Sequence, residues 1–226
     1  MKIRFHETFD QFFKMGVESL PVILFCMVIV ASMSLLEFSY HMKLVLKQDA
    51  LVPAFSTLLL VKELAPVVTS LLLASRIGAG MAAEIGMMRV SEQIDQLRLL
   101  GVSPFEFLIL PRVLGAVFAC VTLSSVALAF SFLSSALFSG IWMGHSSQEF
   151  LHSSLLFTNP KDLLDCVVKP LIFGFIIGGV ACFQGLRCDL GSRGVGEAAT
   201  HAVVRSSLLI IILDFVITLT LSRLII

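Results

Sequence analysis

Long segments almost free of charged residues constrain the fold of this chain more than any other feature. An uncharged stretch runs from residue 113 to residue 143 and contains a predicted span at 113–139; the other predicted spans lie near residues 17–36, 50–75, 166–186 and 204–222. About 20 apolar residues suffice to cross the hydrocarbon core of a bilayer as a helix. Because backbone groups in lipid must bond within their own helix, the sequence predicts an all-α protein with about five transmembrane helices.

The composition excludes a soluble globule and a nucleic-acid-binding protein. Hydrophobic residues make up 57% of the chain and charged residues only 14%, against about 25% charged in an ordinary soluble domain. The 16 Lys and Arg residues balance the 16 Asp and Glu residues, so there is no basic excess to hold a nucleic acid. The cysteines show no CxxC spacing, and they predict neither a disulfide framework nor a metal site: Cys26, Cys120, Cys166, Cys182 and Cys188.

The basic residues between the spans predict the orientation, since cytoplasmic loops collect Lys and Arg. One side of the membrane receives about twice as many as the other, namely Lys2, Arg4, Lys14, Arg76, Arg89, Arg98, Arg112, Arg187, Arg193 and Arg205. The other side receives Lys43, Lys47, Lys161, Lys169 and Arg223. We therefore expect a cytoplasmic N-terminus, cytoplasmic loops at 75–112 and 187–205, and a C-terminus on the outer side.

Residues 1–16 have an amphipathic pattern. Phe5, Phe9 and Phe13 recur at helical spacing, opposite charged residues, which predicts an interfacial helix on the inner leaflet. No segment has the composition of a separate soluble domain, so we expect a single membrane domain over residues 1–226.

A short helix is strongly predicted at residues 91–100. Ser91 is a suitable N-cap, Glu92 and Asp95 place negative charge in the first turn, and Gly101 suits the position after the last turn. At roughly 15 Å this helix is too short to cross a membrane.

The two faces of the 91–100 helix differ. Ile94, Leu97 and Leu100 share an apolar stripe, and the opposite ridge is polar. This arrangement is typical of a docking element; a loop helix resting on the membrane surface is the alternative. The candidate docking residues are Ser91, Glu92, Gln93, Asp95, Gln96 and Leu99.

Charges inside the predicted spans are functional candidates because they are costly in a membrane. Lys62 and Glu63 point about 100° apart on a helix and cannot simply neutralise each other. Two alternatives stay open for them: they line a cavity wall, or they form a clamp between helices or snorkel toward the outer interface. Asp214 shares a stripe with Ser207 in the last span, and we expect Asp214 to have a structural hydrogen-bond partner on a neighbouring helix.

Several segments together resemble the MlaE/YrbE permease family. They are 62–95 (KELAPVVTSLLLASRIGAGMAAEIGMMRVSEQID), 111–112 (PR), 194–207 (GVGEAATHAVVRSS) and 213–215 (LDF). The resemblance covers most of the chain from about residue 15 onward. The chain differs from the family in its shortened N-terminus and at Lys62, where the family commonly has Arg.

The resemblance implies the permease subunit of an ABC transporter that moves phospholipid between the inner and outer membranes of Gram-negative bacteria. The 91–100 helix would then be the coupling helix on a separate cytoplasmic ATPase, which would hold ATP and Mg²⁺. A second copy of the chain would complete the core, and an MCE-domain protein would sit on the periplasmic side. The chain itself would be no enzyme and would need no cofactor; it contains no GxxxxGK[ST] loop.

For a lipid carrier, Lys62 is the candidate contact for a phosphate. The predicted wall of the lipid cavity consists of Leu59, Lys62, Glu63, Pro66, Thr69 and Ser70. The alternative function is an ion- or proton-coupled secondary transporter, in which Lys62, Glu63 and Asp214 would be the coupling charges.

Overall fold

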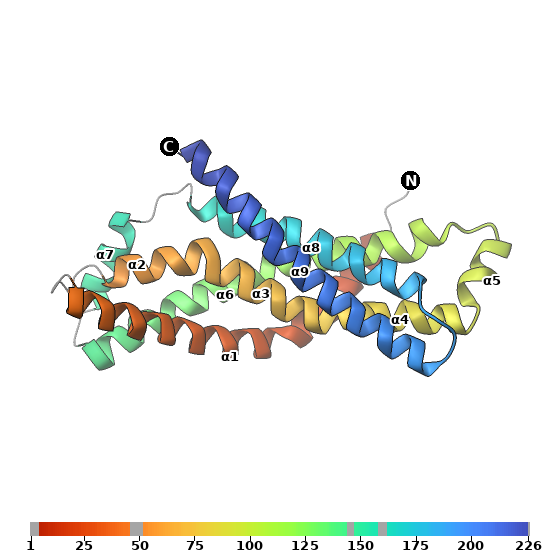
Figure 1. Cartoon of the computed structure of the whole chain (residues 1–226), viewed down its shortest axis with the longest axis horizontal. Helices are drawn as coiled ribbons and strands as arrows, with labels where there is room; N and C mark the ends of the chain where they lie inside the picture. Colours follow the sequence, from red (N-terminus) through yellow and green to blue (C-terminus); the bar gives the residue numbers. More distant parts are fainter. Residues whose placement is uncertain (1–4, 46–51, 144–146, 158–161, 226) are drawn as a thin grey trace. The chain divides into compact units, whose positions relative to one another are not determined.

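The computed structural model describes residues 5–45, 52–143, 147–157 and 162–225 (Figure 1). Every regular element within these ranges is a helix, which confirms the all-α prediction. The elements are α1 (Phe5–Val45), α2 (Val52–Leu59), η2 (Leu60–Leu64), α3 (Ala65–Leu73), η3 (Ala74–Gly78), α4 (Ala79–Val90), α5 (Gln93–Leu99), η4 (Phe105–Ile109), α6 (Leu110–Met143), α7 (Ser147–Phe157), α8 (Asp162–Leu186) and α9 (Ser192–Ile225).

Five helical segments are long and apolar enough to cross a membrane, as predicted. They are Gln11–Met42, Val52–Val90, Phe105–Trp142, Asp162–Leu186 and Ser192–Leu221. Each is longer than the corresponding predicted span, because a helix continues past the hydrocarbon core wherever no residue ends it. The chain is therefore a multi-pass membrane protein.

The first helix corrects one prediction. α1 continues unbroken from Phe5 to Val45, so residues 5–16 are not a separate interfacial helix. This end of α1 lies close to α6: a Cβ on Gly115 would lie 3.3 Å from the backbone nitrogen of Phe12. Because Gly115 has no side chain, the first turns of α1 pack against α6 as a regular helix. Whether this part of α1 lies on the inner leaflet stays a prediction.

The second membrane segment is one helical rod, from α2 to α4, with two π-helical turns. In η2 the backbone N–H of Ala65 donates to the carbonyl of Leu60, five residues earlier. Pro66 follows directly and has no N–H to offer the carbonyl of Lys62. The π turn that carries Lys62 and Glu63 therefore lies where the proline interrupts the regular hydrogen-bond ladder. Beyond η3 the segment continues as α4.

The chain divides into two compact units whose boundaries fall within helices. Unit 1 contains Met1–Ser19, Ser70–Val121 and Lys169–Ile226, and unit 2 contains Leu20–Thr69 and Thr122–Val168. The prediction of a single domain stays a prediction.

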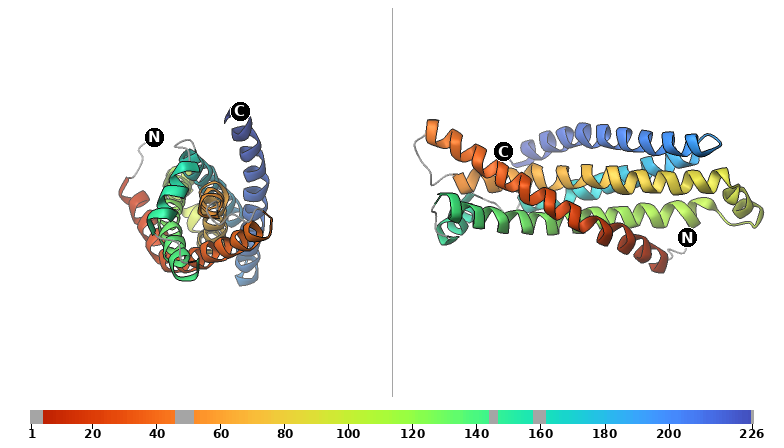
Figure 2. Two further views of the ribbon diagram at one scale, coloured as in Figure 1. Left: turned by 90° about the vertical axis from the view of Figure 1, so that its left-hand side faces the viewer. Right: turned by 90° about the horizontal axis from the view of Figure 1, so that it is seen from below.

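Unit 1 is built on close helix packing. α4 and α9 lie side by side (Figure 1 and Figure 2). Glycines of α8 allow other helices to approach: a Cβ on Gly174 would lie 2.6 Å from the Cα of Val117, and one on Gly185 would lie 2.7 Å from the Cβ of Ile85. α8 is thus held against both α6 and α4.

Unit 2 has a core of its own. Leu35 of α1, Val52 of α2 and Phe150 of α7 are fully buried together. Thr57 of α2 donates a hydrogen bond to Ser154 of α7 at 3.1 Å. This polar contact fixes α7 on α2.

Candidate functional site

The short helix α5 lies at the end of α4 and is seated on the core of unit 1 (Figure 1). Ile94 is 4% exposed and packs with Ile85, Leu108 and Cys182, which come from α4, η4 and α8. Leu97 also packs against this cluster. The predicted apolar seat therefore exists, and it joins α5 to three other elements at once.

Leu100 does not belong to the seat, contrary to the sequence pattern. α5 ends at Leu99, and Leu100 follows as its C-cap with ψ of 2°. This turn takes Leu100 off the helical stripe, and its side chain is 77% exposed. Gly101 has a φ of +73°, which confirms its predicted position after the last turn.

Ser91 is not the N-cap of α5. Its hydroxyl donates to the carbonyl of Met87 at 2.8 Å, so it bonds back into the last turn of α4. The residue that precedes α5 is Glu92, which has a left-handed backbone with φ of 59° and makes no side-chain cap. The reason is that Ser91 is the C-cap of α4, so its hydroxyl bonds into that helix and the left-handed Glu92 stands between it and α5.

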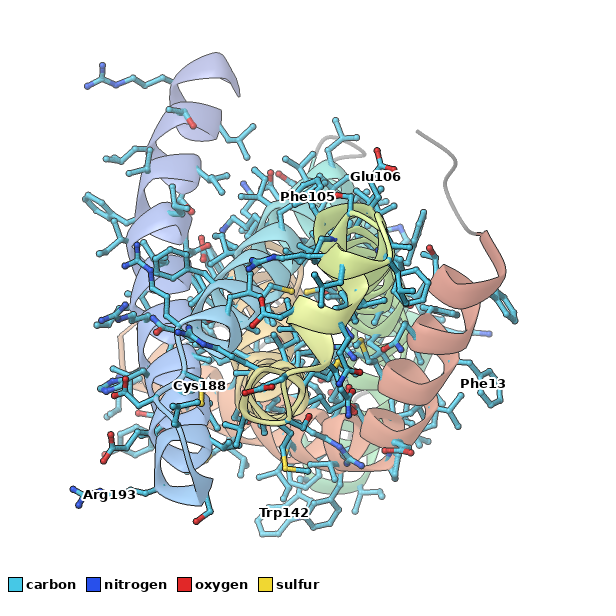
Figure 3. All side chains as sticks on the ribbon, turned by 90° about the vertical axis from the view of Figure 1, so that its right-hand side faces the viewer. Phe13, Phe105, Glu106, Trp142, Cys188 and Arg193 are labelled. Carbon is cyan, nitrogen blue, oxygen red and sulfur yellow. The ribbon has the colours of Figure 1, made fainter. Side chains whose placement is uncertain are left out.

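All the predicted docking residues are exposed. Ser91, Glu92, Gln93, Asp95, Gln96 and Leu99 lie at the surface, and Leu99 is 88% exposed. Asp95 accepts a hydrogen bond from Arg98 at 3.0 Å along the ridge. Figure 3 looks onto this end of unit 1, where Phe105 and Glu106 mark the start of η4. The surface formed by the exposed side of α5 is called the α5 ridge below.

A groove lies beside the α5 ridge, and the sequence patterns did not point to it. It has a volume of about 610 Å³ and runs between the turn after α4 and the start of α9. Met87 and Met88 line one side, and Gly191 and Val195 line the other. Two adjacent methionines before a polar loop were the available signal, since Met is common at adaptable binding surfaces.

Residues next to the groove connect the end of α4 to the end of α8 and to the loop after it. Arg89 donates a hydrogen bond to the carbonyl of Leu186 at the end of α8. Cys188 is buried against Gly86, whose Cβ would lie 3.2 Å from the Cys188 sulfur. Burial raises the pKa of the Cys188 thiol above its usual value, while the nearby Arg89 lowers it. This thiol is therefore a packing group and a poor nucleophile at neutral pH.

Lys62 is paired with an aspartate. Its Nζ lies 2.9 Å from an Asp162 carboxylate oxygen in the first turn of α8, and the two side chains are 32% and 7% exposed. This contact supports the clamp between helices, one of the two alternatives left open by the sequence.

The other members of the predicted cavity wall differ in burial. Leu59 and Glu63 are half-buried, whereas Pro66, Thr69 and Ser70 are buried. The Thr69 hydroxyl has no hydrogen-bond partner, and the Ser70 hydroxyl lies 3.3 Å from the Cys120 sulfur. Only the first part of the set, around Lys62, reaches the surface of this chain.

Asp214 has a partner on a neighbouring helix, but the contact is an ion pair and not the predicted hydrogen bond. Lys169 of α8 places its Nζ 2.8 Å from an Asp214 oxygen and 2.9 Å from the Thr218 hydroxyl. Ser207 is half-buried and lies about 10 Å away along α9, so it is not part of this pair.

Lys169 was grouped with the outer loops by sequence, whereas the structure has it inside α8 with a side chain that is 1% exposed. The sequence contained one signal for a buried lysine: Asp214 lies in the last span, and a carboxylate at that depth needs a cation as partner.

Two more ion pairs in unit 1 went unpredicted. Arg112, at the start of α6, is buried and lies 3.3 Å from Glu84 of α4. Arg76 of η3 lies 3.7 Å from Glu18 of α1, where both side chains are largely exposed. Within the described ranges, no three His, Cys, Asp or Glu side chains gather as a metal site would require.

Comparison with known proteins identifies the family. The profile of permease MlaE matches residues 8–220. The chain is 36% identical over 221 residues to the Arabidopsis thaliana protein TRIGALACTOSYLDIACYLGLYCEROL 1, chloroplastic, an alignment that covers 96% of this chain but only 62% of that protein. It is 35% identical over 207 residues to a probable ABC transporter permease protein of Rickettsia conorii, covering 90% and 78% of the two chains. A probable ABC transporter permease protein of Synechocystis is 39% identical over 159 residues, covering 70% and 60%. The chain therefore belongs to the MlaE permease family.

Proposed function

We propose that this ABC permease moves phospholipid between the inner and outer membranes of a bacterium, driven by a separate cytoplasmic ATPase. The observation that carries the proposal is the α5 ridge. A short helix whose apolar side is buried in the core and whose polar side is exposed offers a surface to another protein while staying fixed to the membrane helices.

The seat of α5 provides the mechanical link. Ile94 packs simultaneously on α4, η4 and α8, and Arg89 bonds the end of α4 to the end of α8. Close-packed interiors have low compressibility, so a displacement of α5 moves the helices beneath it. ATP binding and hydrolysis on the partner would in this way change the arrangement of the membrane helices, without catalytic residues in this chain.

The name of the Arabidopsis relative supports the lipid part of the proposal, because that name includes the name of a lipid, trigalactosyldiacylglycerol. The α5 end of unit 1 would face the cytoplasm together with the N-terminus, and the C-terminus would face the periplasm, because the basic loops predict this orientation. Two copies of the chain would enclose the lipid chamber, and an MCE-domain protein would receive the lipid on the periplasmic side. Such a system would maintain the lipid asymmetry of the outer membrane.

The alternative function is a secondary transporter. The energy source distinguishes the two functions, because an ABC transporter uses ATP and a secondary transporter uses an ion gradient. The complex is purified from native membranes and reconstituted into vesicles that contain a fluorescent phospholipid. We expect an ATPase to copurify, and lipid transfer to acceptor vesicles to require ATP and to stop with a non-hydrolysable analogue. Transfer that proceeds without ATP and follows an imposed proton or sodium gradient would contradict the proposal.

A further inference from the structure

The Lys62–Asp162 pair of unit 2 is asymmetric in its exposure. The lysine side chain is 32% exposed, whereas the aspartate side chain is 7% exposed, although their charged atoms are only 2.9 Å apart. A molecule that approaches this pair therefore meets the cation first. A partly exposed charge within a membrane-spanning segment faces water, another subunit or a ligand, because lipid chains do not solvate it.

Asp162 has a second source of stabilisation besides Lys62. It lies in the first turn of α8, together with Asp165. The partial positive charge of a helix N-terminus stabilises a carboxylate in this position, and does so more strongly when the site is partly buried. The carboxylate consequently loses only part of its stabilisation when Lys62 leaves it.

The side chain of Lys62 can change its ion-pair partner. Its ammonium group sits at the end of a flexible stem, so the group can change partner without backbone motion. The π turn that carries it lies between two regular helices, and π turns are frequent at functional sites. An arginine would grip the carboxylate with two parallel hydrogen bonds and would exchange partners less readily.

We propose that Asp162 competes with the phosphate of the transported lipid for Lys62. Without lipid, Lys62 is held by Asp162; with lipid, the ammonium group turns to the phosphate while Asp162 stays at the α8 N-terminus. When Asp162 recaptures Lys62, the phosphate loses its cation and the lipid is released. The inference rests on the proposed function, because it assigns a release residue to that lipid site.

A Lys–Asp pair of unit 1 is a natural control. Lys169 and Asp214 are 2.8 Å apart, but the lysine side chain is 1% exposed. A ligand cannot reach this cation, so the pair acts as a permanent clamp. Removing its carboxylate is not expected to increase lipid binding.

The first test measures lipid bound to the purified complex after exchange with detergent micelles that contain phosphatidylglycerol or uncharged diacylglycerol. Asp162→Asn is expected to retain several-fold more phosphatidylglycerol and to release it more slowly, with no change for diacylglycerol. Lys62→Ala should lower phosphatidylglycerol binding. The double variant should behave like Lys62→Ala, because Asp162 acts only through Lys62. Asp214→Asn should show no gain.

The second test uses the unmodified protein, so that it does not depend on the folding of a variant. Dicyclohexylcarbodiimide enters membranes and joins a contacting lysine and aspartate as an amide, which mass spectrometry detects. We expect the Lys62–Asp162 product to fall when the complex is loaded with phosphatidylglycerol and to persist with diacylglycerol. The Lys169–Asp214 product should not change in either case.

The outcomes separate this inference from the proposed function. If lipid binds and moves with ATP, but Asp162→Asn leaves phosphatidylglycerol occupancy and release unchanged and loading leaves the amide yield unchanged, Asp162 is a structural clamp and the inference is wrong. If the wild-type complex neither holds nor moves phospholipid, the proposed function itself fails.

Discussion

Lys169 and Asp214 form a buried ion pair between α8 and α9, with 2.8 Å between the lysine Nζ and a carboxylate oxygen. The two residues are far apart in the sequence and lie on different helices. Their pairing explains how each helix tolerates a charge at membrane depth, since each charge compensates the other.

The first prediction concerns this pair. Lys169 is almost fully buried, so Asp214→Ala leaves an uncompensated charge and should destabilise the protein by about 3–5 kcal/mol. The double variant Lys169→Met with Asp214→Leu should recover most of this loss, because apolar side chains of similar size need no compensation. Thermal unfolding in detergent micelles, followed by loss of the monodisperse peak, measures both. If the double variant is no more stable than Asp214→Ala, the unpaired charge of Lys169 is not the cause of the lost stability.

The second prediction concerns the α5 ridge. Glu92→Lys with Asp95→Lys reverses its charge without touching the Ile94 seat, so binding of the ATPase should be lost while the membrane helices stay folded. Copurification and ATP-driven lipid transfer measure the effect. Glu37→Lys is the matched control, since Glu37 is an exposed carboxylate on α1, in unit 2. A double variant that still binds the ATPase at wild-type stoichiometry would show that the ridge is not the docking surface.

The third prediction concerns the turn before α5. Glu92 has a φ of 59°, a conformation that costs a non-glycine residue about 1–2 kcal/mol. Glu92→Gly should therefore leave stability unchanged or raise it by up to about 1 kcal/mol. Gln96→Gly, at an exposed position in the middle of α5, should lower it by about 1 kcal/mol. Equal effects of the two substitutions on thermal unfolding would argue against the left-handed turn.

The fourth prediction tests the packing of α8. A Cβ on Gly174 would lie 2.6 Å from the Cα of Val117, whereas a Cβ on Gly179 would have no heavy atom within 4 Å. Gly174→Ala should force α8 away from α6 and cost about 1–3 kcal/mol. Gly179→Ala should be neutral or slightly stabilising, because alanine favours a helix. If Gly174→Ala melts at the wild-type temperature, the two helices are not in the close contact described.

The helices of this protein could be predicted from local information. Long apolar segments require helices in a membrane, so the five spans and the all-α fold followed from hydropathy. The α5 ridge was also predictable, because Ile94 and Leu97 recur at helical spacing beside charged residues. The family resemblance depends on the order of residues along the chain and was equally visible.

The contacts between helices were decided only by the tertiary structure. Nothing local indicates that Lys62 faces Asp162, that Lys169 faces Asp214 or that Arg112 faces Glu84, because a charge reveals its need for a partner but not which helix supplies it. Ser91 likewise matched the pattern of an N-cap, yet the turn between α4 and α5 gave its hydroxyl to the carbonyl of Met87. Hydropathy and periodicity determine which segments become helices, whereas ion pairs and caps depend on how those helices are turned toward one another.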